Sequence, residues 1–417
     1  MRIAVLGAGI VGVSTAEWLR RDGHAVTLID RVAPGDPAQA SHGNAGVLAA
    51  GSIVPVPVPG LWLKAPRMLL DPDGALFLKW RHLPRLLPWL ARYLAQGRRD
   101  RVERIAAALA PLVSDTVTMH AALAEGTGAE AHVGTARFTH LHPDRASWEG
   151  NALARALERA AALGFETLDR AALAERDPAL GPAYRFGVEF TESGMVTDPG
   201  AYMAALAEHF VQEGGTLRRA EIADARPDGE GVAVTAGGET ERFDHAVIAM
   251  GAWSGTLARR LGHDPALESE RGYHLMLERP SRMPPVPYLL ADSKFVATPM
   301  TGGLRLAGLD EFGGLEAPPS AAPTRFQRRR VRRLYPDLEW EGERVWMGHR
   351  PSTIDSLPLL GPSPKAPAIS FAFGTQHLGL TMGPKLGRLV ADTVAGRRPN
   401  IDMAPYRVGR FDRAGGA

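Results

Sequence analysis

Four residues near the start of the chain have the types and spacing needed to hold a dinucleotide. Gly7, Gly9 and Gly12 form a G-x-G-x-x-G motif, and Asp30 follows 18 positions after the last of them. In such motifs the first glycine permits a tight turn, the second lets a pyrophosphate approach the backbone, and the third allows close helix–strand packing. The acid can accept both hydroxyls of an adenosine ribose. The pattern predicts a dinucleotide site, and the alternative is an ordinary βαβ unit.

The segments around these residues are the ones that would position them. Arg2 to Leu6 is a short run of Ile, Val and Leu, which predicts a strand buried on both faces. A helix is predicted to begin around Ile10 and Val11, where free N–H groups and a partial positive charge favour a pyrophosphate. A second strand is predicted from His24 to Ile29, and it ends at Asp30. Strand, glycine turn, helix, strand and acid therefore occur in the order that the site requires.

A long segment rich in small residues follows the second strand, from position 33 to 60. It is dense in Gly, Ala and Pro, and Ser41, His42 and Asn44 add polar groups. Loops of this length are uncommon in compact domains unless they have a function. We interpret the segment as backbone that wraps around a flat ligand, with a plain surface loop as the alternative.

Composition limits the classes of function. The 417 residues carry 48 basic and 46 acidic side chains, a net charge of +2, so bulk charge gives no case for nucleic acid as a partner. The chain has no cysteine, which excludes disulfides, thiol catalysis and a cysteinyl-linked cofactor and fits a reducing compartment. We expect no metal site. The length favours two domains.

Two segments combine helical periodicity with many basic residues. The first lies within 61–126, and its basic residues are Lys79, Arg81, Arg85, Arg92, Arg98, Arg99, Arg101 and Arg104. The second, at 325–336, holds six arginines without the interleaved aromatic residues of a nucleic-acid groove. We interpret both as solvated faces. For the first, the alternative is a patch for anionic lipid or for an acidic electron-transfer partner.

Targeting and membrane-spanning segments are not expected. The apolar N-terminus contains the glycine motif, so its removal as a signal peptide would destroy the nucleotide site. No uninterrupted apolar stretch reaches the ~18 residues that span a bilayer. Further along, a helix is predicted to begin at Asp198-Pro199, β-rich sections to occupy 216–241 and 267–312, and a last helix to run from Pro384 to Ala395.

Several separated motifs together resemble the D-amino acid dehydrogenase branch, of the small-subunit type, in the FAD-dependent D-amino acid oxidase superfamily. They are the N-terminal glycine unit, SHGNAG at 41–46, AMGAWS at 249–254, ERGYHLML at 270–277, GHRPSTIDSLPLLGP at 348–362 and HLGLTMGPKLGRLVADTVAGRRPNID at 377–402. The resemblance implies an α/β fold with a discontinuous Rossmann-like FAD-binding domain. It also implies an α+β substrate domain with a mostly antiparallel sheet. The implied division gives 1–60, 196–262 and 340–417 to the FAD-binding domain, and 61–195 and 263–339 to the substrate-binding domain.

The resemblance implies one FAD, bound without a covalent link. The positions that match the family's cofactor-binding residues are Gly7, Gly9, Ile10, Val11, Gly12, Asp30, Arg31, Ser41, His42, Asn44, Ala45, Gly46, Val47, Ile222, Gly251, Leu378, Gly379, Leu380 and Thr381. Within this set Arg31 is expected beside the adenosine, and Ile222 is expected to hold the adenine through its backbone. The turn at 378–381 is expected to cover the pyrimidine end of the flavin. Many relatives have Glu where this chain has Asp30, and the shorter acid can do the same task.

The resemblance also implies residues that hold the substrate. Arg350 matches the arginine that grips the substrate's α-carboxylate, which a planar guanidinium can do through two parallel hydrogen bonds. The alternative for this residue is a structural salt bridge. Tyr273 matches the tyrosine that shares the carboxylate or shapes the pocket, and His274 is a further catalytic candidate. Weaker candidates are Arg305, Gln376 and His377.

The implied reaction is the FAD-dependent dehydrogenation of a D-amino acid. Hydride leaves the α carbon for the flavin and gives an imino acid, which hydrolyses to a 2-oxo acid. Cyclic substrates such as hydroxy-D-proline are candidates. No side-chain base is required if the amine arrives neutral, so we nominate none. The alternatives are a secondary-amine oxidase of the sarcosine or glycine type, a flavoprotein subunit that only passes electrons, and nicotinamide in place of flavin.

The expected partners follow from this reaction. They are a small D-amino or D-imino acid and an electron acceptor, which is oxygen, a quinone or another carrier. We expect a cytoplasmic protein with at most a peripheral contact with the inner membrane.

Overall fold

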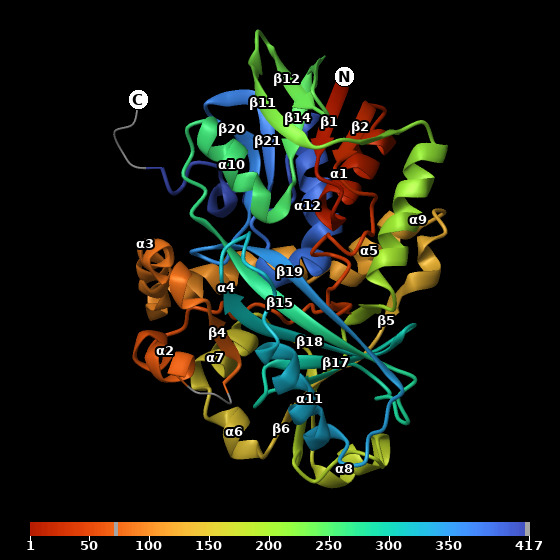
Figure 1. Ribbon diagram of the computed structural model, residues 1–417, viewed down its shortest axis with the longest axis vertical. Helices are drawn as coiled ribbons and strands as arrows, with labels where there is room; N and C mark the ends of the chain where they lie inside the picture. The colour runs from red at the N-terminus through yellow and green to blue at the C-terminus, as the bar shows by residue number, and fades with distance from the viewer. Residues whose placement is uncertain (71–73, 413–417) are drawn as a thin grey trace.

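Two parts of the chain lie one above the other, with the nucleotide-binding part at the top of Figure 1. The computed structural model describes residues 1–70 and 74–412. Residues 71–73 and 413–417, which belong to the predicted ranges 61–195 and 340–417, lie outside that description.

The upper part is built on a six-stranded sheet in the order β10-β2-β1-β14-β21-β20. Its strands are β1 (Arg2–Leu6), β2 (Ala25–Asp30), β10 (Thr216–Arg219), β14 (His245–Ile248), β20 (Leu359–Ser363) and β21 (Ala366–Phe373). Strands β10, β2, β1, β14 and β21 run parallel to one another, and β20 at the edge of the sheet is antiparallel to β21. Because three distant segments supply the strands, the predicted discontinuous Rossmann-like sheet is confirmed.

Both faces of this sheet are covered, as a parallel sheet requires. Along β1, Ile3 and Val5 belong to the core with the helices, whereas Ala4 and Leu6 belong to the core on the opposite face. The helical side contains α1 (Ile10–Arg21), α4 (Arg99–Val113), α5 (Thr116–Ala124), α9 (Pro199–Gln212) and α12 (Gly379–Val394). The other side contains α10 (Ser254–Arg260) and an antiparallel sheet of β11 (Ile222–Asp228), β12 (Gly231–Ala236) and β13 (Glu239–Phe243).

The lower part is built on a nine-stranded sheet in the order β19-β15-β18-β17-β16-β6-β8-β7, with β4 paired to β18. Its strands are β4 (Leu76–Leu78), β6 (Phe138–His142), β7 (Phe165–Leu168), β8 (Phe186–Phe190), β15 (Leu267–Glu278), β16 (Tyr288–Leu290), β17 (Phe295–Met300), β18 (Gly303–Phe312) and β19 (Gly342–Thr353). The pairs β6–β16 and β4–β18 are parallel, and the other pairs are antiparallel. The mostly antiparallel sheet predicted for the substrate domain is confirmed.

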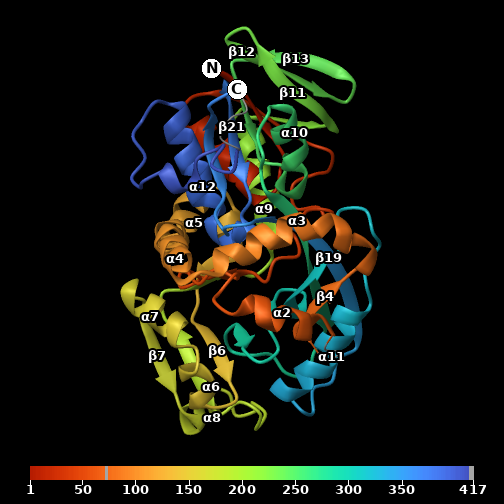
Figure 2. The ribbon, with the colours of Figure 1, turned by 90° about the vertical axis from the view of Figure 1, so that its left-hand side faces the viewer.

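Helices cover one face of the lower sheet, and the other face is directed toward the upper part. Leucines of β15 and β18 pack with Phe326, Val331 and Leu334 of α11 (Ala322–Leu334), and Leu173 of α8 (Arg170–Arg176) joins that core. Figure 2 shows α11 and α8 on the outside of the sheet.

The remaining elements are α2 (Leu61–Leu70), α3 (Leu83–Leu94), α6 (Arg145–Glu149), α7 (Ala152–Ala160) and a small sheet of β3 (Val47–Leu48), β9 (Gly194–Val196) and β5 (Val133–Thr135). Short 3-10 helices are η1 (Trp80–His82), η2 (Ala95–Gly97), η3 (Ala129–His132), η4 (Gly251–Trp253), η5 (Gln376–Leu378) and η6 (Ala404–Tyr406).

The structure divides the two parts differently from the predicted ranges at two places. β19 lies within the range 340–417 predicted for the FAD-binding domain, yet it pairs with β15 along its whole length in the lower sheet. Conversely, α4 and α5 lie within the predicted substrate range 61–195, yet their apolar residues belong to the core of α1 and α12. Hydrogen-bond pairing and side-chain burial across long sequence separations decide both assignments.

The last helix begins five residues earlier than predicted, at Gly379 rather than at Pro384. A proline inside a helix removes the hydrogen bond to the carbonyl four residues earlier, here that of Leu380. His120 of α5 replaces that bond, because its Nε2 donates to the Leu380 carbonyl at 2.8 Å. The helix therefore continues through the proline, and its start reaches the site described below.

One stretch, Arg99–Ala124, is long and apolar enough to cross a membrane by length and composition alone. It comprises α4 and α5, which Ser114 and Asp115 separate. Leu109, Leu112 and other apolar residues of the stretch are buried in the core of the upper part. This packing is that of a core helix in a folded domain.

Candidate active site

A cavity of about 480 Å³ lies between the carboxyl ends of β1, β2 and β14 and the inner face of the nine-stranded sheet. This is the place where open α/β sheets bind their ligands. The predicted site residues that line it are Gly7, Gly9, Ile10, Val11, Asp30, Arg31, Ser41, Asn44, Ala45, Val47, Ile222, Gly251, Tyr273, Arg350, Gln376, His377, Leu378, Gly379, Leu380 and Thr381. Five other candidates, Gly12, His42, Gly46, His274 and Arg305, lie behind its wall.

The glycine turn at the end of β1 requires glycine for reasons visible in the structure. Gly7 has φ +103°, and a Cβ on it would lie 2.5 Å from the Ala249 carbonyl oxygen. A Cβ on Gly12 would collide with the Gly7 carbonyl, so this residue serves helix–strand packing rather than ligand contact. The turn leaves the N-terminus of α1 facing the cavity.

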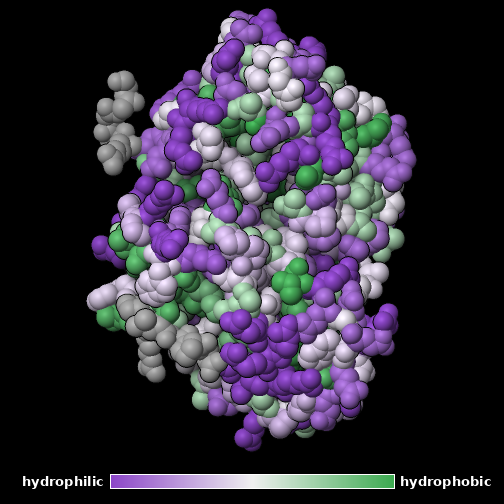
Figure 3. Space-filling model, viewed as in Figure 1, coloured by the Kyte–Doolittle hydropathy of each residue, from purple (hydrophilic) through white to green (hydrophobic). Residues whose placement is uncertain are grey.

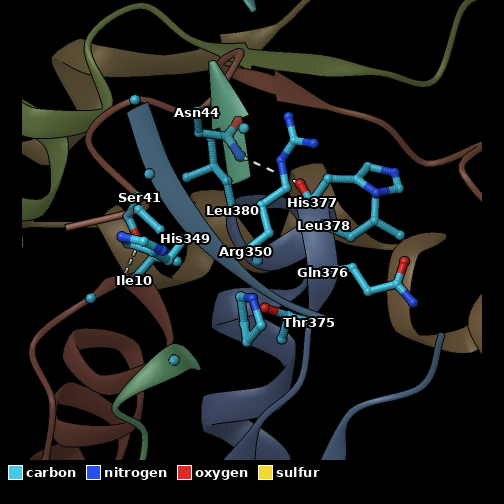
Figure 4. Close-up of a pocket in the computed structure, with 18 of the residues that line it drawn as sticks. Ile10, Ser41, Asn44, His349, Arg350, Thr375, Gln376, His377, Leu378 and Leu380 are labelled. Carbon is cyan, nitrogen blue, oxygen red and sulfur yellow. Dashed lines mark hydrogen bonds between the residues drawn. The ribbon is translucent and has the colours of Figure 1, made fainter. Parts of the chain in front are cut away.

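Two side chains fix the backbone around this turn. Asp30 accepts a hydrogen bond from the Ala8 N–H at 2.6 Å and one from the Val32 N–H at 3.2 Å. Ser41 Oγ accepts the Ile10 N–H at 3.1 Å at the start of α1, as Figure 4 shows. The guanidinium of Arg31 stacks on the Trp253 ring at 4.5 Å, which closes this end of the cavity.

The segment from 41 to 47 is held in place by the lower sheet. His274 Nδ1 donates to the Gly43 carbonyl at 3.1 Å. Arg305 Nη1 donates to the carbonyls of His42 and Asn44 at 3.1 and 2.7 Å. Burial lowers the pKa of His274 to about 3, so its ring is neutral. His274, predicted as a catalytic candidate, and Arg305, a weaker candidate, contact the wrapping segment and do not line the cavity.

The indole of Trp346 passes between the wrapping segment and β19. Its Nε1 donates to the Pro37 carbonyl at 2.6 Å, and its ring stacks on His274 at 5.0 Å. A Cβ on Gly43 or on Gly348 would overlap the indole. The absence of side chains at these two positions therefore lets one aromatic ring fasten the segment to the sheet.

The turn before α12 faces the cavity with unpaired polar groups. Gln376 has φ +51°, and its buried Nε2 has no hydrogen-bond partner among the residues that the structure describes. The first N–H groups of α12 have no intrahelical partners, as at any helix start. In Figure 4 the Asn44 amide reaches the His377 carbonyl, at 3.5 Å, and ties the wrapping segment to this turn. Unpaired donors of this kind fit the oxygen-rich pyrimidine end of a flavin.

Arg350 extends into the cavity from β19 (Figure 4). Its Nη1 donates to the Leu309 carbonyl at 3.0 Å and contacts the carboxylates of Asp310 and Glu270. Its Nε and Nη2 have no hydrogen-bond partner in the described part of the chain. The guanidinium lies over Gly272, where a Cβ would be 2.5 Å from Nε. Arg350 therefore allows both expected roles. Its Nη1 forms a structural salt bridge, and its Nε–Nη2 edge has no partner among the described residues and could bind a carboxylate.

Tyr273 contributes to the cavity wall, but its hydroxyl is engaged elsewhere. The hydroxyl donates to Glu311 at 2.6 Å and accepts the Ser320 N–H at 2.9 Å. Arg271 binds the same carboxylate at 3.2 Å. Burial and Glu311 raise the pKa of Tyr273 to about 12. A hydrogen bond from Tyr273 to a substrate carboxylate stays a prediction, and the geometry gives this residue a wall position.

Sequence reasoning missed several residues of the cavity wall. Glu270 and Asp310 flank Arg350, and His140 lies with Phe138 among the wall residues of the lower part. A charged residue inside a predicted apolar strand was the available signal for Glu270, because such residues are rarely buried without a function or a partner. His140 carried no signal, since its strand alternates like an ordinary sheet strand.

Comparison with known proteins places this site in a family. The family profile DAO, described as FAD dependent oxidoreductase, matches residues 2–393. The chain belongs to this family. A curated D-amino-acid oxidase of Bradyrhizobium diazoefficiens is 39% identical over 98% of each chain, and a D-amino acid dehydrogenase of Dechloromonas aromatica is 30% identical over 97% of this chain and 99% of its own.

A solved structure shares the fold. The glycine oxidase of Geobacillus kaustophilus superimposes with a TM-score of 0.74, at 23% identity, over 98% of this chain and 99% of that one. The family match makes the protein an FAD-dependent oxidoreductase, and the glycine turn, the wrapping segment and the start of α12 are the parts expected to hold the cofactor.

Proposed function

We propose that this FAD-dependent oxidoreductase oxidises the α carbon–nitrogen bond of D-amino acids, including cyclic D-imino acids. The observation that carries the proposal is Arg350, which lines the same cavity as the groups that fit FAD and makes its hydrogen bonds to the described residues through Nη1 alone. A carboxylate can bind that edge through two parallel hydrogen bonds. The names of the two curated relatives, a D-amino-acid oxidase and a D-amino acid dehydrogenase, support the choice of substrate and of its configuration.

The protein's own residues supply binding and orientation. Arg350 pins the carboxylate, and the cavity wall excludes water from the α carbon. When bound, FAD supplies the acceptor for the hydride. Fixing the reacting atoms in this way contributes up to roughly 7–11 kcal/mol in well-oriented intramolecular reactions. The product is an imino acid, which water hydrolyses unless the ring of a cyclic substrate retains it.

The wall away from Arg350 is mostly apolar. Phe138, Leu289 and Val296 line it, and they come from three neighbouring strands of the lower sheet. Apolar walls favour apolar side chains in a substrate. These apolar side chains support small aliphatic and cyclic substrates, and His140 and Lys294 add polar groups to the same part of the wall.

Anaerobic reduction of the bound flavin tests the proposal. A panel of amino acids, D and L, linear and cyclic, is mixed with the purified holoenzyme without oxygen. We expect bleaching of the flavin by D-amino acids and not by their L isomers. Bleaching by sarcosine or glycine alone would favour a secondary-amine oxidase. No bleaching by any amino acid would leave the electron-transfer subunit and reject the proposal.

The electron acceptor forms a second, separable proposal: a membrane quinone or a similar carrier, reached by a cytoplasmic protein at the membrane surface. The support is a group of exposed apolar residues on α2, η1 and α3, namely Trp62, Leu63, Trp80 and Leu87. Arg98 to Arg101 border a shallow hollow beside Trp62. Figure 3 shows apolar residues at its left-hand edge, where Figure 1 places these helices. Exposed aromatic residues next to arginines suit an anionic lipid surface.

Two measurements test the acceptor. Stopped-flow reoxidation of the reduced enzyme compares oxygen with a soluble quinone, and we expect the quinone to react faster. Sedimentation with phosphatidylglycerol vesicles should recover the wild-type protein and lose a Trp62→Ser, Leu63→Ser variant. Equal recovery with neutral phosphatidylcholine vesicles would contradict the electrostatic part, and fast reoxidation by oxygen alone would indicate an oxidase.

A further inference from the structure

Two carboxyl groups beside Arg350 have no part in the reaction as derived so far. Glu270 of β15 and Asp310 of β18 both line the cavity. Asp310 forms an ion pair with Arg350 Nη1, and Glu270 Oε1 lies 3.4 Å from the same nitrogen. Glu270 Oε2 accepts a hydrogen bond from the Ser352 hydroxyl at 3.0 Å. The pair therefore occupies one terminal nitrogen and leaves the Nε–Nη2 edge for a ligand.

A substrate held by that edge brings its nitrogen close to the pair. In an α-amino acid the carboxylate and the ammonium group are attached to the same carbon, so both lie at this end of the cavity. An ammonium nitrogen has no free electron pair and cannot form a C=N bond. One proton must leave the nitrogen before or as the hydride departs.

We propose that the Glu270–Asp310 pair accepts the proton that the substrate's α-ammonium group loses, an inference that rests on the proposed amino acid substrate. An N–H bond of the ammonium breaks, its electron pair stays on nitrogen, and an O–H bond forms on the carboxyl pair. Hydride loss from the α carbon to FAD then converts the C–N single bond to C=N. The proton and the two electrons are thus accounted for.

A further unpaired polar group lines the same cavity. Gln376 is 6% exposed, its Nε2 is unpaired among the described residues, and it lines the same cavity. A buried amide donor without a partner costs free energy, which a bound polar group recovers. The carboxyl pair, Arg350 and this amide all line the one cavity, which therefore offers polar groups to both the cofactor and the substrate.

The electrostatic surroundings give the pair the basicity that the role requires. Burial raises the pKa of Glu270 to about 8, Asp310 adds to the rise, and Arg350 and Ser352 oppose it. The other titratable groups facing the pair are Tyr93 of α3, whose pKa burial raises well above its usual value, and His377 of η5. Burial and Arg350 lower the pKa of His377 to about 4, so neither group is charged at neutral pH. Glu270 is therefore the member of the pair that accepts a proton well near pH 8.

A purely structural role for the pair would have different consequences. If Glu270 and Asp310 only orient Arg350, their removal weakens carboxylate binding. If they accept the proton, their removal slows flavin reduction and moves its pH dependence. Propionate, which has the carboxylate but no amine, separates these two roles.

The experiment measures anaerobic flavin reduction by D-alanine and D-proline from pH 6 to 10, in the wild type and in Glu270→Gln and Asp310→Asn. In the wild type we expect the rate constant to rise with pH through about 8. General-base removal typically costs about 10²–10⁴-fold, so we expect each variant to lose about 100-fold. Each variant should also lose the rise near pH 8. The Kd of propionate, read from the flavin spectrum, should stay within about threefold or fall, because the free edge of Arg350 remains.

Several outcomes would overturn the inference. Wild-type rates and pH profiles in both variants would do so, as would unchanged rate constants with much weaker propionate binding. Because the amines of the two substrates differ in pKa, a wild-type profile that follows the substrate's amine rather than staying fixed would also overturn it. This last comparison needs no variant, so it decides the matter even if the substitutions prevent folding. A wild-type flavin that neither substrate nor any other amino acid reduces would reject the proposed function itself.

Discussion

Arg350 has two separate sets of neighbours, and each set explains a different property. Its Nη1 is engaged by the Leu309 carbonyl and by two carboxylates, which fix the plane of the guanidinium. Its other edge lies over Gly272, where the lack of a side chain keeps the approach open. A guanidinium oriented in advance loses less entropy when it binds a carboxylate.

Arg350→Ala should weaken the binding of carboxylates while FAD stays bound. Hydrogen bonds to charged groups contribute about 1.5–3 kcal/mol each, so loss of two should raise the Kd of propionate by at least about 100-fold. Titration of the flavin spectrum with propionate measures this. The matched control is Arg328→Ala, which removes a surface arginine paired with Glu343. Loss of FAD from the Arg350 variant with unchanged propionate affinity would contradict the assignment.

At the scale of elements, the wrapping segment takes its shape from residues far away in the sequence. Arg305 and His274, on two adjacent strands of the lower sheet, hold three successive carbonyls of this segment at 42–44. The sequence alone identified the segment and both side chains but could not join them, because more than 220 positions separate them. The glycine turn, by contrast, was predictable, because its strand, helix and acid follow one another within about 30 residues.

Arg305→Met should loosen the wrapping segment and weaken FAD binding. The methionine keeps most of the buried volume but loses the bonds to the carbonyls of His42 and Asn44. We expect the Kd of FAD to rise by about 10- to 100-fold, in line with the loss of one or two charge-assisted hydrogen bonds. Ultrafiltration of the holoprotein followed by FAD titration measures it. Arg325→Met, at an exposed position of α11, is the control.

His120→Phe should disturb the start of α12, because the Leu380 carbonyl freed by Pro384 would lose its donor. An unsatisfied buried carbonyl costs about 1–3 kcal/mol, so we expect the free energy of unfolding to fall by that amount and FAD binding to weaken. Tyr202→Phe removes only the hydroxyl that contacts His120 Nδ1. It should lower stability without changing FAD affinity. Equal effects of both substitutions on FAD affinity would reject the link to α12.

At the scale of the whole molecule, the two sheets were predictable as types but their borders were not. Alternating and continuous apolar runs indicated which strands are half-buried and which are fully buried. The pairing of β19 with β15 and the burial of α4 and α5 against α1 and α12 depend on contacts across the entire chain. For the same reason the cavity wall contributed by Glu270, Asp310 and His140 emerged only from the assembled structure.

Stability of the whole protein should be greatest near pH 6.5. Burial lowers the pKa of His120 and His245 to about 4 and of His274 to about 3, from 6.5. Below pH 6.5 the unfolded chain therefore binds more protons than the native one. The free energy of unfolding falls as the pH drops toward 4, by up to about 1.4 kcal/mol per pH unit for each such group.

Glu270 acts in the opposite sense. Its raised pKa means that the native state holds an extra proton between about 4.5 and 8, so stability falls as the pH rises through that window. Urea unfolding of the holoprotein from pH 4.5 to 9 measures both limbs. Glu270→Gln should flatten the alkaline limb and leave the acid limb in place. A stability that is highest at pH 8 in the wild type would contradict the assignment of Glu270, and a stability that does not fall from pH 6.5 to 4.5 would contradict the histidine assignments.

The indole of Trp346 has a consequence for recombining this protein with its relatives. The ring fits only between Gly43, in the cofactor-wrapping segment, and Gly348, in the substrate sheet. A chimera that takes residues 1–60 from one relative and the remainder from another would join halves shaped for different rings at this seam. In any such chimera, positions 43, 346 and 348 should therefore come from the same parent.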